Sequence, residues 1–116
     1  NEFLQVLINI LNNARDELIK YEHERYIFIN AKKIEENLNI EIYDNAGGIN
    51  KKFISKVFEP YFSTKDKSIG TGIGLYMSHE IISKHLHGTL TAENTKYEYK
   101  DELYKGAKFT IQIPIY

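Results

Sequence analysis

In Gly70-Thr71-Gly72-Ile73-Gly74-Leu75, three glycines alternate with other residues at the start of a helical stretch. Upstream of this run, Asp44-Asn45-Ala46-Gly47-Gly48-Ile49 follows a β-type segment, and an earlier helical stretch carries Asn9 and Asn13. Free backbone N–H groups at a glycine-rich helix start stabilise phosphate. A carboxylate at a strand end can accept from a base amine, and a carboxamide oxygen can bind Mg²⁺. The order of these segments predicts a nucleotide pocket on an α/β fold.

Each segment taken alone has an ordinary alternative. The glycine run lacks the G-x-G-x-x-G spacing of dinucleotide-binding loops and the Gly-Lys-Ser/Thr of a P-loop, so it can also be a hinge without a ligand. Asp44 shares the parity of Ile40 and Ile42 and is expected to face inward, but an Asp-Asn-x-Gly turn after a strand is common. Asn9 and Asn13 can lie on a solvated helix face. The conjunction of all three, in one order, favours the nucleotide site.

Composition restricts the class of protein. The chain has 116 residues, which suffices for one domain, and its 15 basic and 16 acidic side chains give a net charge of −1. Neither nucleic-acid binding nor direct membrane contact is predicted, and the absence of cysteine fits a cytoplasmic domain. Helical periodicity begins at Phe3 without an initiator methionine, which leads us to expect a fragment of a longer protein.

Hydrophobic periodicity predicts a two-layer α/β (α+β) sandwich, in which helices cover one face of a mixed, mainly antiparallel sheet. Apolar spacings of three and four predict helices over residues 3–21, 51–58 and 72–86. Alternating or β-rich segments predict strands over residues 25–32, 37–44, 88–94 and 106–115, with a hairpin extension over residues 95–105. The polar stretches predict loops over residues 45–50 and 59–69, the second of them mobile.

Four motifs follow one another along the chain: Asn9-Ile10-Leu11-Asn12-Asn13-Ala14, the aspartate-glycine turn, Val57-Phe58-Glu59-Pro60-Tyr61-Phe62-Ser63-Thr64-Lys65, and the glycine run. They resemble, in this order, the N box, the first glycine box, the F box and the second glycine box of sensor histidine kinase catalytic domains. The closing Gly106-Ala107-Lys108-Phe109-Thr110-Ile111-Gln112-Ile113-Pro114 is similar to their last strand. The resemblance covers practically the whole chain and implies the Bergerat-type ATP-binding fold of the GHKL superfamily.

The resemblance implies that ATP and Mg²⁺ are the ligands. Asn13 would bind the Mg²⁺ that bridges the phosphates, and Asn9 would support the phosphate end. Asp44 would accept from the adenine amine, with Gly48 and Ile49 lining the ring.

The phosphate end of the implied site includes a lid over residues 59–69. Lys65 in this lid would meet the γ-phosphate, where a cation offsets developing charge. Phe58 and Phe62 would anchor the lid by packing. The residues implied to wrap the triphosphate, with a leucine behind them, are Gly70, Thr71, Gly72, Gly74 and Leu75.

Two positions depart from the family pattern. Ala46 stands where a glycine is usual, so the turn must keep a right-handed conformation there or be strained. Asp16 stands one turn after Asn13, where many relatives place a basic residue, and we leave it out of the predicted site.

The residue at position 9 distinguishes kinases from ATPases. Related ATPases use a glutamate four residues before the metal asparagine to activate water, whereas the amide of Asn9 cannot act as a general base. The resemblance therefore implies transfer of the γ-phosphate to a histidine on a separate dimerisation domain, with a response regulator downstream. His23 and His79 are not expected to be the acceptor, because neither lies in a hairpin of long helices.

The isolated fragment is expected to autophosphorylate negligibly. A parent protein that is anchored in the inner membrane is compatible with this cytoplasmic domain. A related serine kinase or ATPase, and a catalytically silent nucleotide-sensing module, stay as alternative functions.

Overall fold

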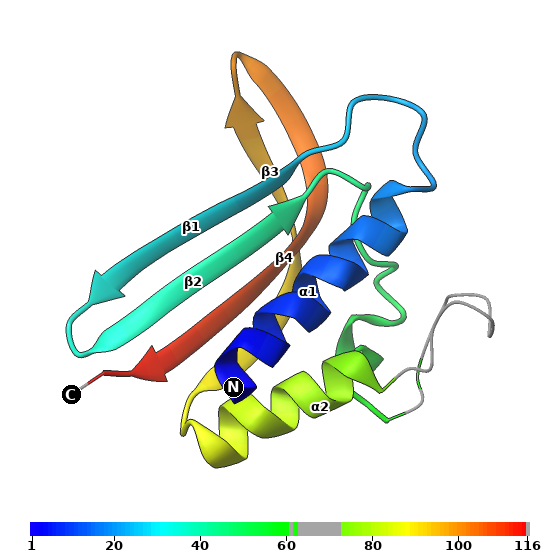
Figure 1. Cartoon of the computed structure of the whole chain (residues 1–116). Coiled ribbons are helices and arrows are strands. Elements are labelled where there is room, and N and C mark those ends of the chain that lie inside the picture. The colour runs from blue at the N-terminus through cyan, green and yellow to red at the C-terminus, as the bar shows by residue number, and fades with distance from the viewer. Residues whose placement is uncertain (61, 63–72, 116) are drawn as a thin grey trace.

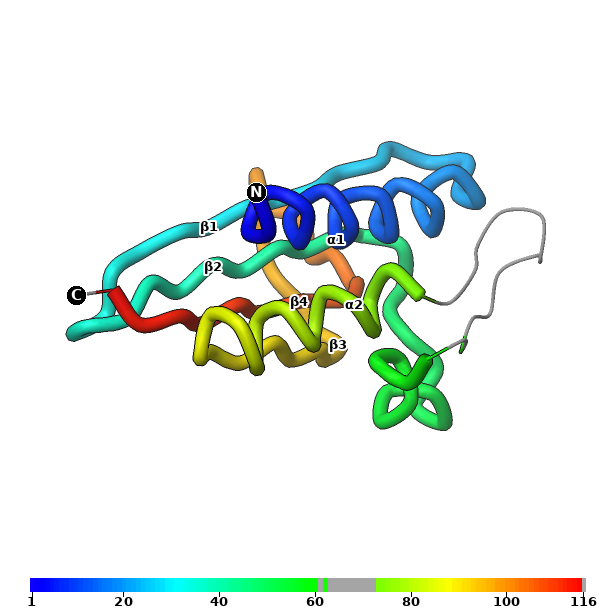
Figure 2. Tube along the Cα trace, turned by 60° about the horizontal axis from the view of Figure 1, so that its bottom comes forward, coloured from blue at the N-terminus to red at the C-terminus, as the bar shows by residue number. Residues whose placement is uncertain are grey.

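The computed structural model describes residues 1–60, 62 and 73–115. The helices and strands, in chain order, are α1 (Glu2–Leu18), β1 (Ile27–Ile34), β2 (Asn37–Asp44), α2 (Gly74–Glu80), β3 (Thr89–Tyr99) and β4 (Glu102–Pro114). The strands form one sheet in the order β1-β2-β4-β3, and every neighbouring pair is antiparallel. Both helices lie on one face of this sheet (Figure 1), beside each other (Figure 2). The predicted two-layer sandwich is confirmed, with antiparallel pairing throughout the described strands.

Helix α1 begins at an N-cap and packs through one apolar stripe. The Asn1 side chain accepts a hydrogen bond from the backbone N–H of Leu4 at 2.8 Å. The buried residues of α1 recur every four positions: Val6, Ile10, Ala14 and Leu18. The helix predicted to reach residue 21 ends three residues earlier, at Leu18, and the next position of the stripe is the exposed Glu22. The Arg25 side chain then donates to the carbonyl of Tyr21 at 2.8 Å and holds the chain as it leaves the helix.

The second predicted helix, over residues 72–86, changes its geometry partway. It is α-helical from Gly74 to Glu80 and continues as a π-helical turn, Ile81–His85. In this turn the N–H of Leu86 donates to the carbonyl of Ile81, five residues back, at 3.0 Å. The wider turn lets Ile81 and Ile82, which are adjacent in sequence, both lie in the core. No helix within the described ranges is long and apolar enough to span a bilayer.

The strand predictions hold with small shifts. β2 coincides with its prediction, and β1 begins and ends two residues later than expected. The predicted hairpin extension is confirmed, since β3 and β4 stay paired to Tyr99 and Glu102. Lys100 and Asp101 join them with φ values of 50° and 66°, the backbone of a two-residue hairpin turn. The helix predicted over residues 51–58 is wrong: the segment makes turns with bonds to the third residue back, and only Ile54–Lys56 forms a 3₁₀ turn.

The core lies between the helices and one face of the sheet. Its fully buried side chains come from both layers: Val6, Ile10, Ile42, Ile82, Phe109 and Ile111. Residues at alternate positions of β2 and β4 supply the sheet side of this core, as the period of two requires.

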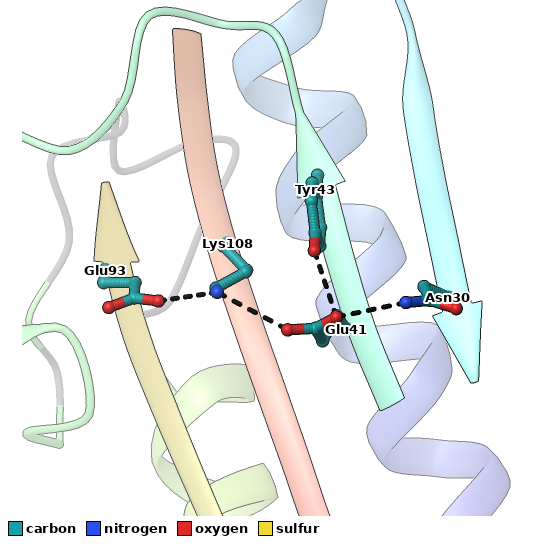
Figure 3. Close-up of polar contacts among 5 residues, drawn as sticks. All are labelled: Asn30, Glu41, Tyr43, Glu93 and Lys108. Atoms are coloured by element: carbon teal, nitrogen blue, oxygen red, sulfur yellow. Dashed lines mark hydrogen bonds and ion pairs between the residues drawn. The ribbon is translucent and has the colours of Figure 1, made fainter. Parts of the chain in front are cut away.

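The other face of the sheet carries a polar network of side chains from β1, β2, β4 and β3 (Figure 3). The Lys108 ammonium on β4 lies 2.7 Å from the carboxylate of Glu93 on β3 and 3.4 Å from that of Glu41 on β2. Burial alone would raise the pKa of Glu41, but hydrogen bonds from Tyr43 and Asn30 and the charge of Lys108 outweigh it and lower this pKa. The charged side chains of Glu41, Lys108 and Glu93 thus link β2, β4 and β3 across this face.

Candidate nucleotide-binding site

Asp44 is the last residue of β2, and its side chain lies on the helix-covered face of the sheet. Only 4% of the residue is exposed, and Ile40 and Ile42 on the same face are also buried. The predicted inward orientation of Asp44 is therefore confirmed. A buried carboxylate is unfavourable unless donors meet it, so its partners define what the site can do.

Two backbone donors contact one oxygen of this carboxylate. Oδ1 of Asp44 accepts from the N–H of Ala46 at 3.0 Å and from the N–H of Ala107 on β4 at 3.3 Å. Within the described part of the chain, no donor contacts the second oxygen, Oδ2. Burial raises the pKa of Asp44, the two N–H groups oppose this, and the charge of Glu17 on α1 adds to the rise. Oδ2 is thus an acceptor available to a ligand.

This burial has a consequence for the pH dependence of stability. Because the pKa of Asp44 is higher in the folded than in the unfolded chain, the folded state binds this proton more tightly. The resulting stability is full below the ordinary value of 3.8 and is lost as the pH rises through the folded pKa. We expect Asp44→Asn to be more stable than the wild type at pH 7, with the difference vanishing below pH 3.8. Urea unfolding of both chains across this pH range measures it, and a constant difference would contradict the assignment.

The turn after Asp44 takes its left-handed residues from glycine and not from Ala46. Left-handed φ values occur at Gly47 (+89°) and Gly48 (+99°), whereas Ala46 keeps a negative φ. An alanine at position 46 is therefore accommodated without strain. Asn45 is buried and ties the turn to the chain before β1, since its side chain accepts from the N–H of Tyr26 at 2.8 Å.

Side chains of β3 hold the same turn, and no sequence motif indicated them. Asn94 accepts from the N–H of Ile49 at 2.6 Å and donates to its carbonyl at 2.8 Å. The Tyr97 hydroxyl donates to the carbonyl of Asp44 at 2.8 Å. These residues lie 45 and 53 positions from their partners. The signal that could have located them is the strand register, which a single sequence does not reveal.

Asn9 links the two helices at the opposite end of the site. Its Nδ2 donates to the carbonyl of Gly74 at 3.3 Å and to the hydroxyl of Ser78 at 3.1 Å, and its Oδ1 accepts from Gln5 at 3.0 Å. Ser78, which sequence reasoning missed, is fully buried. Asn9 therefore contacts the end of the glycine run, at Gly74, through its amide donors.

Asn13 lies between the two ends of the site on α1. One turn before it, Asn9 contacts Gly74, and one turn after it, Glu17 lies close enough to Asp44 to raise its pKa. The half-buried Asn13 side chain therefore lies on the segment of α1 between the residue that contacts Gly74 and the residue that lies near Asp44. Among the described residues no cluster of three His, Cys, Asp or Glu can hold a metal.

The structure describes only some of the remaining predicted site residues. Lys65, Gly70, Thr71 and Gly72 lie outside the described residues, as does the predicted lid apart from Glu59, Pro60 and Phe62. Leu75 packs against the core from the first turn of α2.

The two aromatic side chains predicted to anchor the lid, Phe58 and Phe62, both contact other aromatic rings. Phe58 stacks on His79 of α2 with ring centroids 5.1 Å apart and meets Phe109 edge-on. Phe62 lies 5.4 Å from Phe53. His79 is thus a packing residue inside α2.

The chain is similar to sensor kinases in both sequence and structure. The whole of it, residues 1–116, matches the family described as histidine kinase-, DNA gyrase B-, and HSP90-like ATPase. The two-component sensor PprA of Pseudomonas aeruginosa is 34% identical over 96% of this chain, which spans 12% of that protein. The sensor histidine kinase ZraS of Escherichia coli O157:H7 is 31% identical over 96% of the chain, which spans 21% of that protein. The nucleotide-free catalytic domain of histidine kinase ThkA superposes with a TM-score of 0.76 at 26% identity, over 97% of this chain and 67% of that one.

Proposed function

Since the chain belongs to the family of histidine kinase-, DNA gyrase B- and HSP90-like ATPases, we propose that it binds Mg-ATP and donates the γ-phosphate to a histidine on a separate domain. The observation that supports nucleotide binding best is the buried carboxylate of Asp44, whose Oδ2 has no donor within the described residues. An adenine exocyclic amine is a donor of the right kind for this oxygen. Gly48 and Ile49, in the turn that follows, would line the ring.

The contacts of Asn9 favour phosphoryl transfer over hydrolysis. A hydrolase needs a group that takes a proton from water, and an amide has no such basicity. In addition, both halves of this amide already have partners in Gln5, Gly74 and Ser78. Asn9 would then hold the start of α2 in place for the phosphates. Bound Mg²⁺ would neutralise phosphate charge, and Asn13 is the residue that would hold it.

The acceptor and the downstream partner are proposed from the relatives. Two of these relatives are named a two-component sensor and a sensor histidine kinase, and this chain spans only 12% of the first and 21% of the second. The histidine would belong to a dimerisation domain of the parent protein, and a response regulator would receive the phosphoryl group from it. Lys65 would meet the γ-phosphate, and Gly70, Thr71 and Gly72 would wrap the triphosphate.

Phosphoryl transfer tests this function against its alternatives. The chain is incubated with γ-labelled ATP and Mg²⁺, alone and with the histidine-bearing domain of its parent protein. We expect acid-labile label on that domain, ADP formed in equal amount, and negligible label on the chain alone. Steady ADP release without labelled protein would favour an ATPase, and nucleotide binding without any turnover would favour a sensing module.

The metal role of Asn13 gives a separate prediction. Asn13→Ala is expected to weaken ATP binding about tenfold in Mg²⁺, the effect of losing one charge-assisted contact, and to leave binding in EDTA unchanged. Calorimetric titration with and without Mg²⁺ measures both. Asn12→Ala, an exposed neighbour on the same helix, is the matched control. Equal weakening in Mg²⁺ and in EDTA would show that Asn13 does not hold the metal.

A further inference from the structure

We infer that two side chains of β3, Asn94 and Tyr97, position residues 44–49 for recognition of the adenine base. The inference rests on the proposed nucleotide site and adds to it the residues that set base specificity from outside the pocket. Both side chains hydrogen-bond residues 44–49 only through their backbone, so they are positioning residues and not ligands.

Asn94 pairs with one peptide residue through both halves of its amide. Its oxygen accepts from the N–H of Ile49 at 2.6 Å, and its nitrogen donates to the carbonyl of Ile49 at 2.8 Å. The side-chain amide of Asn94 thus exchanges two hydrogen bonds with one residue of the turn, as a residue of a neighbouring antiparallel strand would. It also requires the glycine at position 48, where a Cβ would lie 2.6 Å from the Asn94 oxygen.

Tyr97 holds the other end of the turn. Its hydroxyl donates to the carbonyl of Asp44 at 2.8 Å. Its ring packs against Phe28 and Tyr43 at centroid distances of 4.9 and 5.1 Å, which fixes where the hydroxyl can reach. Burial, with the charge of Asp44 as the second cause, raises the pKa of Tyr97 well above its ordinary value, so the hydroxyl remains a donor at neutral pH.

Together the β3–β4 hairpin holds the turn at three points. Besides the two side chains of β3, the carbonyl of Lys105 on β4 accepts from the N–H of Gly47 at 3.1 Å. The direction of Oδ2 of Asp44 depends on the backbone of its own residue. Loss of either β3 contact should therefore reduce discrimination between bases while leaving the phosphate end unaffected.

The test compares ATP with ITP, in which a carbonyl replaces the adenine amine. We expect Asn94→Ala to lower the ratio of the ITP to the ATP dissociation constant about tenfold and Tyr97→Phe to lower it about threefold, effects of the size of one or two hydrogen bonds. Affinity for inorganic tripolyphosphate should not change. Thr91→Ala, which alters an exposed residue of the same strand, should leave both quantities unchanged. Hydrogen exchange of the Ile49 amide should accelerate in Asn94→Ala at an unchanged melting temperature.

The outcomes separate this inference from the proposed function. If Asp44→Asn lowers the ITP to ATP ratio while Asn94→Ala and Tyr97→Phe do not, the positioning role is overturned and the adenine site stands. If the wild-type chain shows no preference for ATP over ITP, both are overturned. Should Asn94→Ala fail to fold, Tyr97→Phe decides, because it keeps the ring packing and removes only the hydroxyl.

Discussion

Replacement of Asp44 by asparagine is expected to weaken ATP binding about 100-fold while the chain stays folded. The amide oxygen of asparagine can accept from Ala46 and Ala107 as Oδ1 does now at 3.0 and 3.3 Å. The second oxygen becomes an NH₂ group, so a donor then faces the donor amine of adenine. A lost hydrogen bond to a charged acceptor, together with an unpaired donor, costs roughly 3 kcal/mol, which corresponds to about 100-fold in affinity.

Titration of ATP against a matched control measures this effect. Asp101→Asn removes the same charge at the exposed hairpin turn, where asparagine also tolerates the positive φ, and should bind ATP like the wild type. A circular dichroism spectrum shows whether Asp44→Asn is folded. A folded Asp44→Asn chain that binds ATP within twofold of the wild type would refute the proposed role of Asp44 in reading adenine.

The second large effect is expected from Gly106→Ala, which should lose at least about 3 kcal/mol of unfolding free energy. A Cβ on Gly106 would lie 1.6 Å from the carbonyl oxygen of Asp44 and 2.8 Å from its Oδ1. The nearest obstacle is backbone, which no rotamer change can move, so β2 and β4 must separate where Ala107 donates to Asp44. Overpacking of this kind reaches the upper end of about 1–3 kcal/mol or exceeds it.

Gly74→Ala is the matched control for this prediction. Among the described residues, a Cβ on Gly74 meets nothing nearer than the Asn9 side chain, at 3.9 Å, and the position begins a helix. The control should therefore be neutral or stabilising by up to about 1 kcal/mol. Urea unfolding followed by circular dichroism compares the two variants. An ordinary substitution destabilises a protein by about 1 kcal/mol. If Gly106→Ala loses no more unfolding free energy than about 1 kcal/mol, the strands move apart here at little cost and the prediction is wrong.

The layers and the inward orientation of Asp44 could be predicted because they depend on local pattern. The period of two along β2 places Asp44 on the buried side, and spacings of four along α1 place its stripe. The glycines at positions 47 and 48 mark the turn that follows. Each of these signals lies within about ten residues of the feature that it predicts.

The parts that could not be predicted depend on long-range contacts or on weak local preferences. Asn94 reaches Ile49 only because β3 pairs with β4 in one particular register, and Ser78 meets Asn9 only because α2 crosses α1 there. The apolar residues between positions 51 and 58 suggested a helix, but their backbone bonds reach the third residue back and not the fourth, a choice that apolar spacing in so short a segment does not decide.

The three contacts that hold the turn after Asp44 have a consequence for the entropy of binding. Fixing one residue's backbone requires about 1–2 kcal/mol of conformational entropy, and here that ordering is completed when the chain folds. In the proposed nucleotide site, the base would therefore meet a turn that is already formed, because Asn94 and Tyr97 contact this turn without any ligand. Binding of the base is then expected to cost little conformational entropy in this turn, so that nucleotide affinity mainly reflects the contacts between base and protein.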